Sequence, residues 1–386
     1  MPSILAGAVE IDITPPIGTE LNGYVRESPS NGIHDPLKAA VIMLQTGDQK
    51  LVLIGLDLLG IEMALAGQVR AAIAAALEMP AAGVMIACIH THSGPAGFLP
   101  DLPGMPTDPD PLQQALLERK LVGAARGAAA RLEPARVGVS RGELFGLGAN
   151  RNDAEHGPYD PQVTLLKIEA ADGRLLAALV NYGCHPTVLS GDNLLISADY
   201  PGAARSALQA LYPGAVMLFA NGAAGDISTR FTRRGQGFTE VERMGRLLAG
   251  EALKLLQTAV MLDDITLAAA DTPIQIPLRG FPSLNEMKAN AAYLKAELAR
   301  LTAAGAPQGE IRKMFTRVQG AEMQITQAAK LAGKTRQESV MQGLRIGPLF
   351  LVSMPGEVFT SIALAVKAEY PAEFVAVVSY ANDYQG

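Results

Sequence analysis

The sequence has 386 residues, with 32 Lys and Arg against 38 Asp and Glu, and a formal net charge of −6. Hydrophobic residues make up 49% of the chain and charged residues 18%, a composition that supports a large core and excludes wholesale disorder. The mild acidity argues against a nucleic-acid-binding protein, which would carry a basic face. Two cysteines are too few for a disulfide-stapled secreted scaffold.

The N-terminus has no basic segment followed by a long apolar run, so it does not resemble a signal peptide. No window approaches the roughly 20 consecutive apolar residues of a membrane span. We therefore expect a cytoplasmic protein without a membrane span, and the alternative is that an export signal is missing from this sequence. The sequence does not specify an oligomeric state.

Short apolar runs typical of strands alternate with alanine-rich stretches typical of helices over most of the chain. The sequence predicts strands at 39–44, 50–59, 83–89, 163–168, 175–182, 215–220 and 348–354, and helices at 63–77, 112–132, 202–211 and 239–258. This order predicts a mixed α/β fold in which sheet layers are flanked by helices, with residues 1–386 forming a single domain.

One segment differs from this alternation. Residues 283–333 are rich in Ala, Lys, Glu, Gln and Met, and Ala-Gly-Ala-Pro at 304–307 interrupts them. The pattern predicts a helical hairpin that sits on the α/β body or projects from it. Its simplest interpretation is a surface excursion, and the wall of a substrate channel or a dimerisation arm are functional alternatives.

Histidines follow two of the predicted strands. The strand at 83–89 continues directly into His90 and His92, which share a face because residues i and i+2 of an extended chain point the same way. The strand at 175–182 is followed by His185. Ligands of open α/β sheets gather at the carboxyl ends of strands. Histidines at two such ends therefore indicate a metal or acid–base site.

Two further strand ends carry polar residues that suit such a site. One leads to Glu357, whose carboxylate would complete a His/Glu zinc site that keeps an open position. Another leads to the glycine-rich segment 221–228, whose backbone N–H groups could hold an anion and whose Ser228 could be a nucleophile or a polar support. Spacing alone thus predicts Zn²⁺ held by histidine and glutamate, and it does not separate His90 from His92.

Other residues near these strand ends have two interpretations each. Asp57 and Asp199 could orient the ligand histidines from outside the metal shell, and they could equally be turn or helix-capping acids. Cys88 and Cys184 lie within two residues of candidate ligands, but their strand setting favours small buried fillers over thiolate ligands. We expect His156, in a turn-like loop, to be exposed.

Taken together, the motifs resemble the N-terminal catalytic domain of neutral and alkaline non-lysosomal ceramidases, in a bacterial short form without the C-terminal β domain. The matching stretches appear in the family's order and are IDITPPIGTELNGY (11–24), IHDPL (33–37), HTHSGP (90–95), ANR (149–151), NYGCHPT (181–187), NGAAGDIS (221–228), MPGEVF (354–359) and YANDY (380–384). They cover nearly the whole chain, and HTHSGP together with GDIS is the most specific combination.

The resemblance implies one zinc ion and hydrolysis of the amide bond of N-acyl sphingoid lipids. It implies that His90, His185 and Glu357 are zinc ligands. A fourth ligand would be the second tyrosine of an Asn-x-Tyr-x-x-Tyr pattern, and this sequence ends two residues after Tyr384. Tyr384 substitutes for that ligand, or the chain is cut short, or a water takes the position.

The resemblance also implies catalytic roles. His92 would bind the substrate carbonyl by a hydrogen bond, and Arg151 would stabilise the oxyanion. Ser228 matches a serine whose role as nucleophile or as transition-state support stays open. Because the further β domain is missing, we favour a zinc amidase acting on a small-molecule or lipid N-acyl substrate over a ceramidase in the strict sense.

Two alternatives remain at this point. An esterase or lactonase could use the same metal site, because nothing in the sequence separates amide from ester. A non-catalytic metal-binding relative is the other, and the incomplete tyrosine pattern favours it slightly. Retention of the full set of histidines, arginine, serine and glutamate argues against it.

Overall fold

The computed structural model describes residues 4–99, 109–262, 265–370 and 372–385. Its strands are β1 (Ile4–Asp12), β2 (Gly32–Ile33), β3 (Lys38–Thr46), β4 (Gln49–Leu56), β5 (Val84–Cys88), β6 (Glu133–Glu143), β7 (Ala149–Asn150), β8 (Gln162–Ala170), β9 (Leu175–Tyr182), β10 (Leu195–Ile196), β11 (Val216–Asn221), β12 (Ile227–Ser228), β13 (Val260–Leu262), β14 (Leu267–Pro277), β15 (Arg336–Ile346), β16 (Leu349–Ser353) and β17 (Phe374–Val378). Its α-helices are α1 (Met63–Leu77), α2 (Pro111–Ala129), α3 (Asp199–Leu211), α4 (Phe238–Thr258), α5 (Leu284–Ala303), α6 (Gln308–Lys330) and α7 (Thr360–Glu369).

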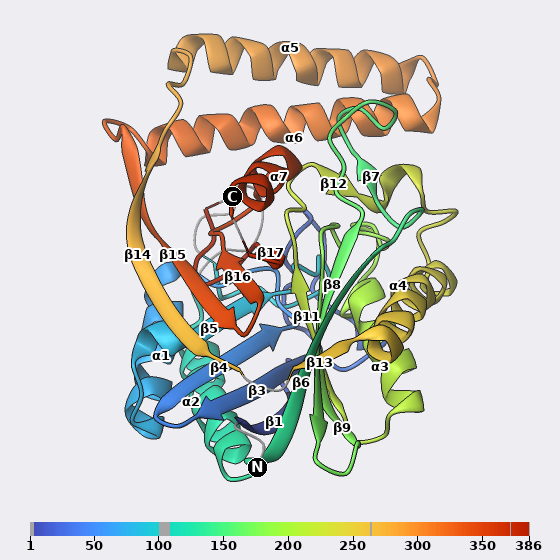
Figure 1. Cartoon of the computed structure of the whole chain (residues 1–386). Coiled ribbons are helices and arrows are strands. Elements are labelled where there is room, and N and C mark those ends of the chain that lie inside the picture. Colours follow the sequence, from blue (N-terminus) through green and yellow to red (C-terminus); the bar gives the residue numbers. More distant parts are fainter. Residues whose placement is uncertain (1–3, 100–108, 263–264, 371, 386) are drawn as a thin grey trace.

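A large mixed sheet forms the centre of the molecule (Figure 1). Its strand order is β11-β9-β8-β6-β1-β3-β4-β5, and β13 also pairs with β6. The sheet is so twisted that β3 and β4 cross β8 and β9 at a steep angle in Figure 1. The twist brings β11 onto β4, where a Cβ on Gly55 would lie 2.7 Å from Cγ of Leu218. The ends of β5 and β9, far apart in strand order, therefore come together.

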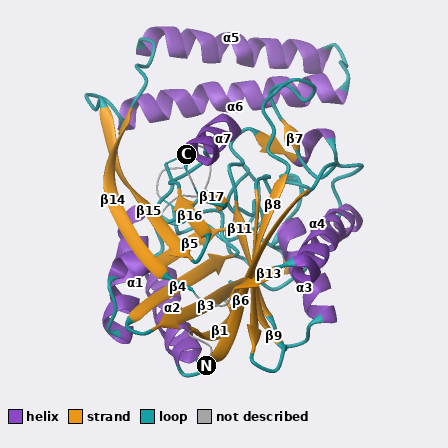
Figure 2. Cartoon of the chain, in the orientation of Figure 1, coloured by secondary structure: helices purple, strands orange, loops and turns teal. Residues whose placement is uncertain are grey.

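Both faces of this sheet are covered, which explains its continuous apolar runs. In β3, Val41 and Met43 join a core shared with helices α1 to α4, whereas Ile42 and Leu44 join a core shared with a second sheet. The second sheet has the order β14-β15-β16-β17, and α7 packs on its outer side through Ala363. Figure 2 shows helices on the outside of these sheet layers. The predicted α/β fold with flanking helices is confirmed.

Several element boundaries differ from the sequence predictions. Helix α2 ends at Ala129 and not at 132, because the strand β6 begins at Glu133. Helix α3 begins at Asp199, so that Pro201 falls in its first turn, where a missing N–H costs nothing. The long strands β14 and β15 were not predicted, because most of their side chains are exposed or half-buried and give no apolar run.

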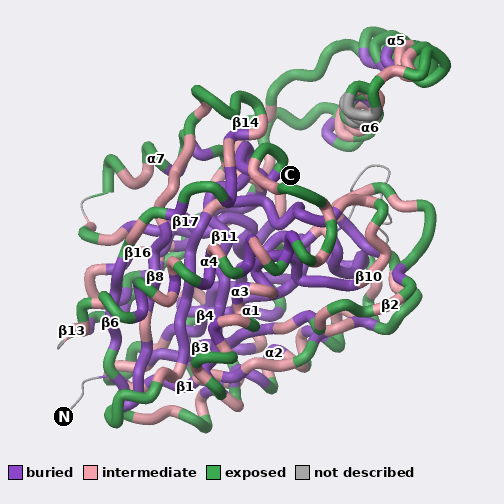
Figure 3. Tube along the Cα trace, turned by 90° about the vertical axis from the view of Figure 1, so that its right-hand side faces the viewer, coloured by how far each residue is buried: buried purple, intermediate pink, exposed green. Residues whose placement is uncertain are grey.

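The helical hairpin predicted at 283–333 is confirmed. Ser283 and Glu286 form a capping box at the start of α5, and Gly305 with a φ of +63° turns the chain before α6. Figure 3 shows the two helices standing away from the body, on the strands β14 and β15. Within the described part of the chain, no helix is both long and apolar enough to cross a membrane.

Candidate metal centre

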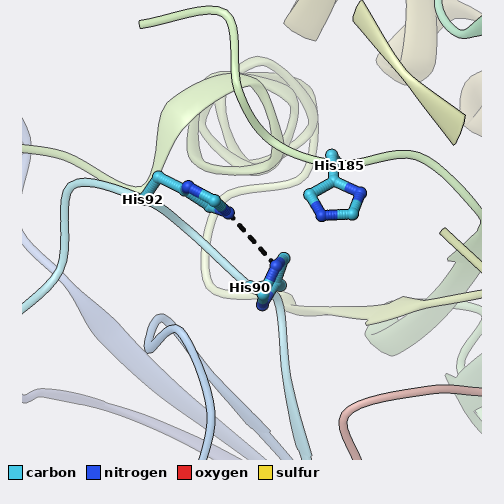
Figure 4. Close-up of side chains that lie close together, drawn as sticks. All are labelled: His90, His92 and His185. Atoms are coloured by element: carbon cyan, nitrogen blue, oxygen red, sulfur yellow. Dashed lines mark hydrogen bonds between the residues drawn. The ribbon is translucent and has the colours of Figure 1, made fainter. Parts of the chain in front are cut away.

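Three imidazoles meet where β5 and β9 end (Figure 4). One ring nitrogen from each of His90, His92 and His185 lies within 4.8 Å of the other two. The side chain of Asn221, at the end of β11, holds the two loops together: its Nδ2 donates to the carbonyl of Ile89 at 3.0 Å, and its Oδ1 accepts from the backbone N–H of Cys184 at 3.2 Å. The structure thus brings together the three histidines that the strand ends predicted to meet.

Backbone carbonyls orient two of these rings. Nδ1 of His90 lies 2.8 Å from the carbonyl oxygen of Leu59, and Nδ1 of His185 lies 2.6 Å from that of Ala224. Because a carbonyl only accepts, each Nδ1 carries the proton and donates it. Burial lowers the pKa of His90 to about 3, so its imidazole is neutral and Nε2 offers a lone pair. A histidine oriented in this way is ready to bind a metal.

Glu357 lies across both rings. Its Oε1 is 3.6 Å from Nε2 of His90, and its Oε2 is 3.2 Å from Nε2 of His185. Burial alone would raise the pKa of Glu357, but its hydrogen bond with His185 and the nearby Arg151 guanidinium hold the pKa well below its usual range. An ionised carboxylate therefore faces two imidazoles whose Nδ1 protons are already donated elsewhere.

These distances fit a zinc ion. With Zn–N and Zn–O bonds of about 2.0–2.2 Å, the ligand atoms of a tetrahedral site lie roughly 3.3–3.6 Å apart. Nε2 of His92 is 3.1 Å from Nε2 of His90. The carboxylate of Glu357 lies 3.2 Å from Nε2 of His185 and 3.6 Å from Nε2 of His90. Geometry alone admits either His92 or Glu357 as the third ligand.

Tyr384 lies at the same centre. Its hydroxyl donates to Oε1 of Glu357 at 2.8 Å, and its ring is 6.0 Å from that of His90. Burial, followed by the charge of Glu357, raises the pKa of this phenol well above its ordinary value. Tyr384, which the sequence analysis considered as a substitute fourth ligand, thus donates a hydrogen bond to the candidate ligand Glu357.

The other candidate residues surround this cluster. Nη2 of Arg151 lies 3.5 Å from Oε2 of Glu357. The backbone N–H of Arg151 donates to the backbone carbonyl of Asp226 at 2.7 Å. Ser228 forms a parallel bridge with His185, and its Oγ accepts from the N–H of Arg230 at 3.4 Å. Sequence-distant residues therefore lie around one centre.

The two candidate second-layer acids have other partners. Asp57 accepts hydrogen bonds from Nη1 and Nη2 of Arg205, at 2.9 and 2.7 Å. Asp199 is the first residue of α3, and its carboxylate accepts from the backbone N–H groups of Tyr200 and Leu189. Burial raises the pKa of Asp199 to about 6. Among the described hydrogen bonds, neither carboxylate contacts a histidine of the cluster, and backbone carbonyls occupy Nδ1 of His90 and of His185.

The predictions about the two cysteines and His156 also have an outcome. Cys88 and Cys184 are buried free thiols, as expected of small core fillers. The side chain of His156 is 82% exposed, as predicted.

Sequence reasoning missed two supporting residues, although both lie inside quoted motifs. The ring of Tyr380 stacks on His90 with centroids 4.0 Å apart and an interplanar angle of 12°. Gly23 has a φ of +97°, and a Cβ there would lie 2.5 Å from Cγ of His92. Tyr380 begins the motif YANDY, and Gly23 is the glycine of Asn-Gly-Tyr in the first motif. The motifs could have drawn attention to both positions, but they did not indicate what either residue does.

Comparison with known proteins decides the family. The family model described as neutral/alkaline non-lysosomal ceramidase, N-terminal, matches residues 4–234, which is more than half of the chain. The chain belongs to this family. The matched range includes His90, His92, Arg151, His185 and Ser228.

Relatives and a solved structure agree with this assignment. The neutral ceramidase of Oryza sativa subsp. japonica is 27% identical over 223 residues, which cover 52% of this chain and 28% of the relative. That of Pseudomonas aeruginosa is 32% identical over 136 residues, covering 31% of this chain and 20% of the relative. The matched stretches span less than a third of either relative's length. The crystal structure of the Pseudomonas aeruginosa enzyme superposes with a TM-score of 0.73 at 22% identity, covering all of this chain and 68% of that one, and so shares the fold.

Proposed function

We propose that this chain is a zinc-dependent hydrolase that cleaves the amide bond of an N-acylated substrate, either a ceramide-like lipid or a smaller N-acyl amide. Membership of the ceramidase family supports the reaction class. The observation that carries the proposal is the convergence of Nε2 of His90 and of His185 on the ionised carboxylate of Glu357. Two histidine Nε2 atoms and one carboxylate, with both Nδ1 protons donated to backbone carbonyls, form a ligand set typical of a zinc site.

In this proposal His90, His185 and Glu357 hold the metal. When bound, zinc would supply Lewis-acid activation of water and of the acyl carbonyl. Tyr384 would hold Glu357 in place through its hydrogen bond at 2.8 Å. The backbone carbonyls of Leu59 and Ala224 would keep both imidazoles in the tautomer that binds metal through Nε2.

His92 and Arg151 would then stabilise the negative charge on the reacting carbonyl. Burial lowers the pKa of His92 well below its ordinary value, so its neutral ring carries one N–H. That N–H points at Nε2 of His90 at 3.1 Å, and it becomes free to donate to substrate once the His90 lone pair is engaged. One well-placed donor of this kind is worth about 3–4 kcal/mol in the transition state.

A substrate panel with metal control tests the proposal. The purified chain is incubated with a short-chain N-acyl sphingosine, an N-acyl amino acid and the matching esters, first as isolated, then after chelation, then with zinc restored. We expect free amine to be released, to disappear on chelation and to return with zinc. Hydrolysis of the esters alone would replace the amidase by an esterase. Zinc binding without any hydrolysis would indicate a binding protein.

Substitution of Gly23 by alanine is expected to lower the rate of amide hydrolysis about 100-fold with zinc content unchanged, because displacement of a catalytic group by about 1 Å costs that much. The new methyl would lie 2.5 Å from Cγ of His92 and push the ring away. Gly18→Ala is the matched control, because Gly18 has a similar φ of +95° with nothing within 4 Å of its Cβ position. Equal rates for the two variants would remove His92 from the reaction.

A further inference from the structure

The charge of the molecule is unevenly distributed. We call residues 278–335, between β14 and β15, the helical arm. The arm has nine Lys and Arg and four Glu, a net charge of +5, whereas the other residues have 23 basic and 34 acidic side chains, a net charge of −11. A basic projection on an acidic body is therefore hidden in the overall charge of −6.

Part of this positive charge is exposed and uncompensated. Lys288 on α5, Arg317 on α6 and Lys334 after α6 are exposed, and none has an ion pair with any described residue. By contrast, Lys295 is paired with Glu322 at 2.6 Å, which ties the two helices together. The arm thus keeps charges that its own fold does not use.

Large apolar side chains are exposed on the same arm. Phe281 is 38% exposed, Leu284 49%, Tyr293 65% and Phe315 50%. The helices already have a core of their own between them, formed by Ala291, Leu294, Val318 and Ala321. The exposed aromatic and aliphatic groups are therefore not needed to hold the hairpin together. Basic and aromatic side chains on one helical element are typical of binding to the interface of a bilayer.

The arm stands on the side of the molecule that carries the metal centre. Figure 1 shows α6 above α7. Glu357 lies just before α7, and Tyr384 lies two residues from the C-terminus. A surface bound by the arm would therefore face the same side of the body as the candidate ligands.

We propose that the helical arm binds the surface of an anionic lipid bilayer. Each basic side chain near such a surface contributes about 1 kcal/mol, or roughly a fivefold gain in affinity, and the acidic body is repelled from it. This polarity would orient the protein arm-first. The acidic body of a second copy is also complementary in charge to the arm, but it offers no reason for the exposed aromatic groups, so the bilayer is the occupant we assign.

Vesicle sedimentation tests this proposal, with vesicles of phosphatidylcholine alone or mixed with phosphatidylserine. We expect the full chain to sediment only with the anionic vesicles at an ionic strength of about 0.01 M, and to be released at about 1 M, where the Debye length falls to about 3 Å. The variant Lys288→Glu/Arg317→Glu should bind at least tenfold more weakly, from about fivefold for each charge removed. The matched control Arg119→Glu/Arg126→Glu changes the same net charge at exposed positions of α2, away from the arm, and should bind like the parent.

Three results would overturn the proposal. They are equal binding to neutral vesicles, equal loss of binding in both double variants, and no binding by the parent chain. Light scattering without vesicles identifies the competing arrangement, because a parent dimer that the arm variant alone dissociates would make the arm a self-association element. Sedimentation requires no catalysis, and hydrolysis of a water-soluble N-acyl amide should be unchanged in the arm variant. Failure of lipid binding and failure of the proposed amidase function are therefore distinguishable.

Discussion

Replacing His185 with alanine is expected to empty the metal centre and to abolish hydrolysis. His185 supplies an oriented Nε2 at 3.2 Å from Glu357, and its Nδ1 is held by the carbonyl of Ala224. Loss of a residue that merely orients a ligand weakens metal binding about 10- to 100-fold, and loss of a ligand should cost more. Metal analysis by mass spectrometry should find about one zinc per chain in the parent protein and a small fraction of that in the variant.

The control for this experiment is His156→Ala. His156 has a side chain that is 82% exposed and lies outside the cluster, so removing it should change neither zinc content nor rate. A His185 variant that keeps its zinc would show that the metal is bound elsewhere. Loss of zinc with full retention of hydrolysis would separate the metal from the reaction and contradict the mechanism.

The fold was predictable where burial imposes a pattern on the sequence. The strand β3 is covered on both faces, so every residue from Ala39 to Leu44 is apolar and the strand is readable. Helix α1 was predicted with its observed bounds, 63–77. The strands β14 and β15 were missed because their outer halves carry an exposed arm and need no apolar side chains.

The candidate site was predictable because its residues follow strand ends, a local feature of the sequence. His90 and His185 could be paired in this way, and the structure brings them together. Contacts between distant residues could not be predicted. The ring of Tyr380 on His90 depends on how β17 sits beside β16, and the arginine that binds Asp57 lies 148 residues further along the chain.

Arg205→Ala is expected to destabilise the protein by about 3–5 kcal/mol, because it leaves a buried charge without its partner. Asp57 is 1% exposed, and both its oxygens accept hydrogen bonds from Arg205. Burial alone would lower the pKa of Arg205, but Asp57 raises the pKa above its ordinary value. Urea unfolding measures the loss. Arg246→Ala removes an exposed pair with Glu242 at 3.3 Å and should cost less than about 1 kcal/mol.

The same variant tests whether Asp57 acts on the metal centre at a distance. Asp57 lies two residues before Leu59, whose carbonyl orients His90, and the carbonyl of Leu58 accepts from the backbone N–H of His90 at 3.0 Å. The pair between Asp57 and Arg205 therefore anchors the segment that holds His90. Arg205→Ala should weaken zinc binding about 10- to 100-fold under conditions where the protein stays folded. Arg205→Lys keeps the positive charge but loses the bidentate contact with Asp57. It should therefore recover part of the stability. It should recover less of the zinc affinity, because the orientation of the Leu59 carbonyl depends on the bidentate contact.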